Sequence, residues 1–398
     1  MDAYLPRLVE PALHRALRAA PVVVLDGPRA AGKTTTARRL TTGEVLLPRD
    51  LPLLAADAMA YLTTLEPPVL IDEWQLAGVE LLWSIKLLVD EDPTPGRFVL
   101  TGSVEPATYG PTYPLTGRAV RVMMRPMGRA ELGGRGADVT FLERALSDPT
   151  PARSDPAASF DMGWLAESGF PGARDLQDPR LLLEAYAATV AQRAGDEGRD
   201  ATRLLRALRV LATLEGQAVP DQRIWEAADI NKLTWKAYDD LLQRVHLAVP
   251  LPAFESNRLK RLTTYPKRFL ADTALALTLA QLDADVLRSD PRLAGGYLES
   301  FVVQQLRPQV DAVGAVLSHV RTGAGEREVD AVVEHGERIL GFEVKHAARP
   351  VPDDARGLAW LRDQWQERFT GGYVVHTGTE VYPLGERLWA VPAALVAG

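Results

Sequence analysis

The sequence predicts an α/β protein with a parallel sheet at its N-terminus, a mostly helical middle part and a second α/β module at its C-terminus. Three observations predict this class. Apolar strands alternate with helices over residues 1–135, which is typical of a parallel sheet with helices on both faces. The pattern is mostly helical from 179 to 281. Strands and helices alternate again from 292 to the end of the chain.

Within residues 1–135 the apolar spacing predicts three strands and three helices. Each predicted strand is a short run of apolar residues, as expected of a strand that is buried on both faces. A glycine-rich turn follows the first strand and leads directly into a helix. The expected elements are helix 5–19, strand 21–25, helix 34–40, strand 68–72, helix 79–90 and strand 98–101.

The composition is that of a folded protein without cysteine. Its 398 residues are enough for two or three domains of ~150 residues each. With 46% hydrophobic and 24% charged residues, the chain does not have the composition of a disordered protein. The absence of cysteine excludes disulfides, thiolate metal sites and cysteine nucleophiles. A net charge of −7 argues against general coating of nucleic acid but leaves a local basic patch open.

Nothing in the sequence points to a membrane. No apolar run approaches the ~18 residues of a transmembrane helix, and residues 1–13 lack the basic-then-apolar pattern of a secretory signal. We therefore expect a cytoplasmic protein with no membrane contact. The six histidines show no metal-binding spacing, and we expect them to be structural.

The glycine-rich turn after the first strand fits the phosphate-binding loop G-x-x-x-x-G-K-[ST] without a gap. Its glycines let successive backbone N–H groups curl around phosphates. Lys33 is expected to reach the β- and γ-phosphates of ATP, and the Thr34 hydroxyl to bind Mg²⁺. The residues expected to contact the nucleotide here are Gly27, Pro28, Arg29, Ala30, Ala31, Gly32, Lys33, Thr34 and Thr35.

Acidic and polar residues follow the two later strands. Asp72 is expected to hold Mg²⁺ through water, and Glu73 to orient the hydrolytic water as a general base. The third strand ends in Leu-Thr-Gly-Ser, which places Ser103 where a polar side chain can sense the γ-phosphate. The alternative for the Asp–Glu pair is an ordinary solvated loop.

These motifs, in this order, resemble those of prokaryotic AAA-type P-loop ATPases that carry a C-terminal domain of unknown function. The resemblance implies ATP binding and hydrolysis, and it admits a homo-oligomer. It also makes Arg118 a candidate for contact with the γ-phosphate or between subunits, against the alternative of a surface charge after a turn. Trp74 and the Ala30–Ala31 pair depart from the family's usual residues, but neither change removes a side chain that binds phosphate. The segments that carry the resemblance are 27–34, 71–75, 85–90, 97–103, 115–118 and 126–131.

The middle of the chain looks like a winged helix-turn-helix after a linker. Three helices are followed by a hairpin expected at 247–251 and 259–264. Basic residues gather on the hairpin and just after it, which favours contact with nucleic-acid phosphates, DNA more than RNA. The alternative is a hairpin that packs on another domain with its lysines solvated. The residues expected to contact nucleic acid are Arg258, Lys260, Arg261, Lys267 and Arg268.

Two predicted strands of the C-terminal module carry a carboxylate cluster. Asp330 lies on one strand, Glu343 and Lys345 share a face of the next, and Glu299 on the preceding helix can add a third carboxylate. The pattern resembles the PD-(D/E)xK nuclease core, which implies Mg²⁺ or Mn²⁺ held by Glu299, Asp330 and Glu343, a lysine that positions the attacking water, and cleavage of a phosphodiester. An inactive nuclease-like binding module and an unrelated hairpin remain as alternatives.

Together these patterns predict an ATPase domain at 1–135, a linker and helical connector at 136–200, a winged-helix-like domain at 201–290 and a restriction-endonuclease-like domain at 291–398. The expected function is an ATP cycle coupled to a nucleic-acid-facing C-terminal module, with Mg²⁺-dependent DNA cleavage as its extension. The alternative is an ATP-gated regulatory switch whose inactive C-terminal module binds a protein partner.

Overall fold

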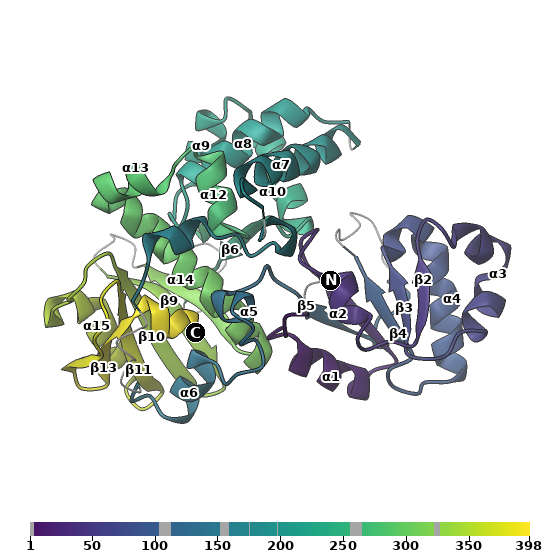
Figure 1. Cartoon of the computed structure of the whole chain (residues 1–398), viewed down its shortest axis with the longest axis horizontal. Coiled ribbons are helices and arrows are strands. Elements are labelled where there is room, and N and C mark those ends of the chain that lie inside the picture. Colours follow the sequence, from purple (N-terminus) through teal and green to yellow (C-terminus); the bar gives the residue numbers. More distant parts are fainter. Residues whose placement is uncertain are drawn as a thin grey trace. The chain divides into compact units, whose positions relative to one another are not determined.

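The computed structural model describes residues 4–102, 113–151, 159–174, 176–196, 198–254, 265–321 and 327–398. The chain divides into two compact units (Figure 1). One unit comprises residues 6–126 and 242–247, and the other comprises the rest of the chain. None of the helices in the described ranges combines the length and the apolar character that a bilayer crossing requires.

The smaller unit is built on a parallel sheet with the strand order β2-β3-β4-β1-β5. Alternate side chains of its central strands enter two apolar cores, one against α3 and α4 and the other against α1 and α2. This arrangement buries both faces of the central strands and confirms the predicted α/β class (Figure 1). The elements are α1 (Glu10–Ala19), β1 (Val22–Asp26), α2 (Lys33–Ala37), β2 (Gly43–Leu46), α3 (Leu51–Thr63), β3 (Val69–Asp72), α4 (Gly78–Glu91), β4 (Phe98–Thr101) and β5 (Ala119–Met123).

Three elements of this unit were not expected from the sequence: β2, α3 and β5. Both strands lie at edges of the sheet, and β5 exposes Val120 and Arg121 to solvent. An edge strand that is only partly buried does not form a continuous apolar run, so its sequence lacks the signal that revealed the central strands. In α3 the apolar residues are so numerous that no single face stands out in the sequence.

The parallel register brings three strand ends to one edge of the sheet. Thr101, the last residue of β4, lies beside Leu25 of β1 on one side and Asp72 of β3 on the other. The loop after β1 therefore begins at the same edge at which Asp72 and Thr101 end their strands.

The larger unit begins with helices and a two-stranded hairpin. The segment predicted as a linker and helical connector, 136–200, contains two helices, α6 and α7, and Phe141 and Leu142 of α6 are buried. From residue 127 to the end of the hairpin, the elements are α5 (Arg129–Leu132), α6 (Phe141–Ser147), α7 (Pro179–Asp196), α8 (Ala201–Thr213), α9 (Asp221–Ala227), α10 (Lys232–Arg244), β6 (Ala248–Leu251) and β7 (Lys267–Leu270). The second hairpin strand, expected at 259–264, is instead β7, and residues 255–264 lie outside the described ranges.

The C-terminal part of this unit is a mixed sheet with the order β12-β13-β11-β10-β9-β8. Strands β8, β9 and β10 are antiparallel, whereas β11 runs parallel to β10 and β13. The expected succession of helix, three strands, helix and strand is present, and a further hairpin and helix follow it. The elements are α12 (Thr273–Leu279), α13 (Ala284–Ser289), α14 (Pro291–Val313), β8 (Val316–Arg321), β9 (Glu328–His335), β10 (Arg338–Lys345), α15 (Arg356–Trp365), β11 (Phe369–His376), β12 (Tyr382–Gly385), β13 (Leu388–Pro392) and α16 (Ala393–Ala397).

Candidate functional site

The loop between β1 and α2 has a backbone that its sequence explains. Gly27 has φ of 150°, and a Cβ at this position would lie 2.0 Å from the carbonyl oxygen of Met124, so a side chain is excluded. Ala30 and Gly32 have φ of 63° and 95°, in the left-handed region that glycine adopts freely. Such left-handed residues turn successive N–H groups toward one side of a loop, which is the geometry that binds an anion.

Lys33 holds its ammonium group across this loop. Its side chain is buried, and Nζ donates hydrogen bonds of 2.8 Å to the carbonyl oxygens of both Gly27 and Pro28. Burial lowers the pKa of Lys33 to about 8, against the opposing attraction of Glu73 and Asp26. The loop therefore keeps a cation whose charge is poorly solvated and which gains from a nearby anion.

Asp72 joins the loop to the neighbouring strand ends. Its Oδ1 accepts a hydrogen bond of 2.7 Å from Thr34 Oγ1 and another of 2.5 Å from Thr101 Oγ1. These hydroxyl and carboxylate oxygens are the ligands that Mg²⁺ prefers, so the residues present fit this ion. Glu73 follows with φ of 54°, and its Oε2 accepts a 2.5 Å hydrogen bond from Gln75 Nε2, which orients the carboxylate.

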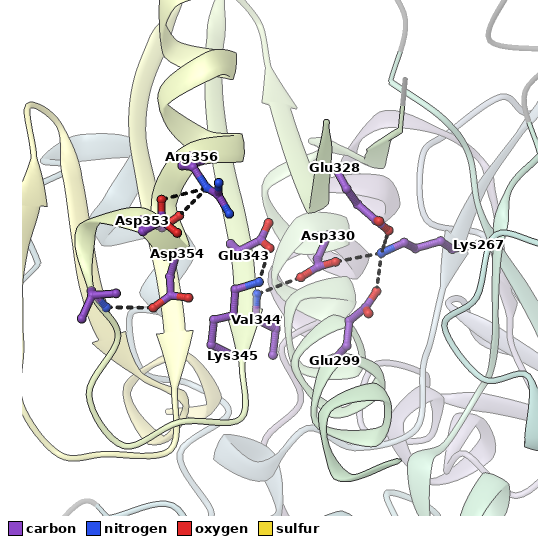
Figure 2. Close-up of polar contacts among 11 residues, drawn as sticks. Lys267, Glu299, Glu328, Asp330, Glu343, Val344, Lys345, Asp353, Asp354 and Arg356 are labelled. Atoms are coloured by element: carbon purple, nitrogen blue, oxygen red, sulfur yellow. Dashed lines mark hydrogen bonds and ion pairs between the residues drawn. The ribbon is translucent and has the colours of Figure 1, made fainter. Parts of the chain in front are cut away.

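A second charged cluster lies in the larger unit, around Lys267 of β7. Figure 2 shows carboxylates pointing toward its ammonium group from α14 and β9. Nζ lies 2.8 Å from Glu299 Oε1, 2.8 Å from Asp330 Oδ1 and 3.1 Å from Glu328 Oε1. The Lys267 side chain is only 2% exposed, so these ion pairs are shielded from water.

The next strand completes the cluster. Val344 N donates a 2.9 Å hydrogen bond to Asp330 Oδ2, and Lys345 Nζ donates one of 2.7 Å to Glu343 Oε1 (Figure 2). The other carboxylate oxygen of Glu343, Oε2, is buried and has no hydrogen-bond partner within the described ranges. The two strands thus bring Asp330, Glu343 and Lys345 together, as their alternation in the sequence predicted.

Burial and charge separate the pKa values in this cluster. Burial alone would lower the pKa of Lys267, but the carboxylates of Asp330, Glu299 and Glu328 hold it well above its usual value. Burial likewise acts to raise the pKa of Asp330, yet Lys267 keeps it below the ordinary value. Burial, followed by the charge of Asp330, raises the pKa of Glu299 and of Glu343 to about 8 each. Near neutral pH the firmest ion pair is therefore Lys267 with Asp330.

The predicted divalent-metal site does not fit this arrangement. An ammonium group lies between Glu299 and Asp330, where the sequence predicted Mg²⁺ or Mn²⁺. Within the described ranges no group of three or more His, Cys, Asp or Glu side chains is arranged to hold a metal ion. The physical reason is that Lys267, on a strand outside the predicted motif, already supplies the positive charge that these carboxylates require.

Three regions of the chain match known protein families. Residues 19–133 match a family described as an AAA domain. Residues 164–286 and 294–396 match two families that are each described as a domain of unknown function. The AAA match includes the loop, Asp72 and Glu73.

Two curated proteins are similar along almost the whole chain. They are uncharacterized proteins of Mycobacterium tuberculosis and Mycobacterium bovis, each 30% identical over 389 residues, which is 96% of this chain and 82% of theirs. The chain belongs to the same family as these two proteins. Because the chain contains an AAA domain, this family is one of P-loop ATPases. Among solved structures, a Walker-type ATPase of Pyrococcus abyssi is 16% identical with a TM-score of 0.41, covering 70% of this chain and 98% of its own.

Of the residues predicted to serve the ATPase site, those of the loop, Asp72 and Glu73 lie at one edge of the sheet. Ser103 lies outside the described residues. Arg118 does not lie near the loop of its own chain. It precedes β5 and its carbonyl accepts from Val22 N, at the opposite end of β1 from Gly27, which is roughly 15 Å along a strand. The expected contact of Arg118 with the γ-phosphate of the same chain is therefore wrong, and Arg118 pairs instead with Asp90 at 2.5 Å.

Two of the five residues predicted to contact nucleic acid are not available at the surface. Lys267 is buried among carboxylates, and Arg268 is 9% exposed and pairs with Asp221 at 2.6 Å. Both belong to a strand that is buried at every position, so neither guanidinium nor ammonium is available to a phosphate. The other three residues, Arg258, Lys260 and Arg261, lie outside the described ranges.

Sequence reasoning missed Thr101 and Glu328, and it assigned Lys267 to the wrong surface. Thr101 could have been found, because the last residue of a central parallel strand lies beside the last residue of its neighbour. Glu328 lies two residues before Asp330 and shares its face of β9, a signal as good as the one that paired Glu343 with Lys345. Lys267 gave no signal, because its partners are distant in the sequence.

Proposed function

We propose that this chain binds MgATP at loop 27–34 and hydrolyses it. The observation that carries the proposal is the hydrogen bonding of Asp72 to both Thr34 and Thr101, which links the loop to the end of the adjacent strand. This is the arrangement that a nucleotide-bound Mg²⁺ requires, with hydroxyl and carboxylate oxygens on one side of the phosphates. The AAA match supports the same conclusion.

Each residue of the proposed ATP site has a separate role. Lys33 binds the β- and γ-phosphates, and the gain is large because its charge is buried. Thr34 would hold Mg²⁺ through its hydroxyl and Asp72 would hold it through water, and the ion would supply positive charge next to the transferred phosphoryl group. Glu73 takes a proton from the attacking water, and its hydrogen bond from Gln75 keeps the carboxylate oriented.

Two substitutions test this assignment. Lys33→Ala is expected to abolish both nucleotide binding and phosphate release, because it removes the cation that binds the phosphates. Glu73→Gln is expected to lower the rate of phosphate release by about 10²–10⁴-fold, the usual contribution of a general base, while binding of ATP persists. Phosphate release and nucleotide binding are measured for both variants.

The control for this experiment is Lys86→Ala, a lysine of α4 that pairs with Asp90 at the surface. Its turnover should equal that of the unmodified chain. Normal turnover in Lys33→Ala would contradict the proposed site.

For the hairpin region and the C-terminal module together we propose binding of nucleic acid, DNA more than RNA, without cleavage. The basic residues at 258–261 support the contact with phosphates. The ion pairs of Lys267 with Glu299 and Asp330 support a non-cleaving module, because cleavage in the nuclease family needs a metal where this ammonium lies. Mg²⁺-dependent cleavage is the second candidate, favoured by the proximity of Asp330, Glu343 and Lys345.

Retention on immobilised duplex DNA at low salt separates these functions. The unmodified chain should bind, and its binding should fall steeply with salt, whereas reversing Arg258, Lys260 and Arg261 to glutamate should abolish it. No DNA should be cut in Mg²⁺ or Mn²⁺. Cutting that disappears in Asp330→Ala would establish the second candidate, and the absence of any retention would favour a regulatory switch with a protein partner.

A further inference from the structure

Three carboxylates surround the ammonium group of Lys267. Oxygens of Glu299, Asp330 and Glu328 lie 2.8, 2.8 and 3.1 Å from one point, the position of Nζ. They come from a helix and a strand that are distant in the sequence, so the convergence is a property of the tertiary structure (Figure 2). The ammonium group donates hydrogen bonds to Glu299 and Asp330, and Glu328 adds an ion pair.

A fourth carboxylate lies beside this set. Glu343 is 8% exposed, and its Oε2 is buried without a hydrogen-bond partner within the described ranges. A buried carboxylate oxygen with no partner is costly, and a cation is the partner that would compensate it best. Lys345 pairs with Oε1 of Glu343, so Oε2 is the oxygen of this carboxyl group that is left for a further ligand.

We propose that Lys267 takes the place of a divalent cation in this cluster, and that a neutral side chain at position 267 turns the cluster into a binding site for one. Calcium and manganese are bound by carboxylate oxygens, with carbonyl oxygens and water completing the coordination. The ligands of such an ion lie roughly 0.5 Å closer than those of an ammonium group, so small side-chain movements suffice. This inference does not depend on ATP hydrolysis or on DNA binding.

The experiment compares the uptake of Mn²⁺ by full-length chains, measured as loss of the free-ion resonance in electron paramagnetic resonance. All chains carry Asp72→Asn, so that the ATPase site does not contribute. The Asp72→Asn parent should bind no Mn²⁺ at the cluster. Addition of Lys267→Met should create one site per chain with a Kd below ~1 mM, and further addition of Asp330→Asn should abolish it.

Lys86→Met is the matched control, because it removes an equal charge from the surface of α4 and should create no site. If Lys267→Met is unfolded in chelator, the proposal requires Mn²⁺ to restore its thermal transition. A second variant, Lys267→Met with Glu328→Gln, removes the most exposed of the three carboxylates and should still bind Mn²⁺.

Two results would overturn the proposal. One is a folded Lys267→Met chain that takes up no additional Mn²⁺, or an unfolded one that Mn²⁺ does not restore. The other is a parent chain that already binds Mn²⁺ at this cluster, recognised by its loss in Asp330→Asn.

Discussion

Lys33 shows how a single side chain can be prepared for an anion. Its ammonium is buried, and two backbone carbonyl groups of the loop hold it in position. Burial depresses its pKa from 10.5 to about 8. In the folded protein the charged form is therefore disfavoured relative to the unfolded chain. This costs stability below pH 8, and the cost disappears as the pH rises toward 10.5.

This shift predicts proton uptake when a nucleotide binds. At pH 9 Lys33 is mostly neutral before binding, since its pKa is about 8, and the phosphates restore the charge. We expect binding of MgADP at pH 9 to take up a large fraction of one proton, and binding at pH 6.5 to take up almost none. Isothermal titration calorimetry in buffers of different ionisation enthalpy measures this number.

A control variant shows whether a lysine other than Lys33 contributes to the proton uptake. Lys86→Ala should leave the uptake at pH 9 unchanged, because this lysine lies at the surface of α4. An observed enthalpy that is independent of the buffer at pH 9 would contradict the assignment of the low pKa to Lys33.

At the scale of elements, strand β7 connects two parts of the larger unit. Its consecutive residues Lys267 and Arg268 point to opposite faces, as side chains along a strand must. Lys267 contacts carboxylates of α14 and β9, whereas Arg268 pairs with Asp221 of α9. One short strand thereby ties the helical part to the C-terminal sheet through two buried charges.

Those two buried charges also explain why β7 does not serve nucleic acid. A hairpin that contacts phosphates must expose its basic side chains. In β7 the basic side chains are used inside the protein, and the described hairpin strand is buried at all four positions. The basic side chains of β7 are therefore not part of a surface that binds DNA.

At the scale of the whole molecule, the chain has two compact units, and each has its own apolar core. Chains of this kind often unfold in more than one step. The ATP site lies wholly in the unit of residues 6–126, and the Lys267 cluster lies wholly in the other.

Scanning calorimetry should therefore resolve two transitions that respond to different changes. A nucleotide at a hundred times its Kd stabilises the unit that binds it by about 2.7 kcal/mol. We expect MgADP to raise the temperature of one transition only, and Lys33→Ala to abolish that rise. Lys267→Met should lower the other transition, since breaking a buried ion pair costs about 3–5 kcal/mol. A single transition that shifts with both changes would contradict two independent units.

Much of the fold could be predicted from the sequence. In central strands and amphipathic helices, the pattern of apolar residues itself shows which side chains are buried. The strands at 21–25, 68–72 and 98–101 agree with the structure to within one residue. Edge strands such as β2 and β5 were missed, since their burial is set by neighbours rather than by composition. Likewise, the loop was predictable because consecutive residues supply its glycines, its lysine and its threonine.

The sequence by itself determined the phosphate-binding loop, the α/β class and the pairing of Asp330 with Glu343 and Lys345. These features depend on residues that are close in the chain or that alternate along one strand. Only the tertiary structure decided the position of Arg118 and the identity of the cation in the carboxylate cluster. Arg118 is separated from the loop by the length of a strand, and Lys267 reaches Asp330 from 63 residues away. Neither distance leaves a periodic signal, because it is fixed by how strands and helices pack.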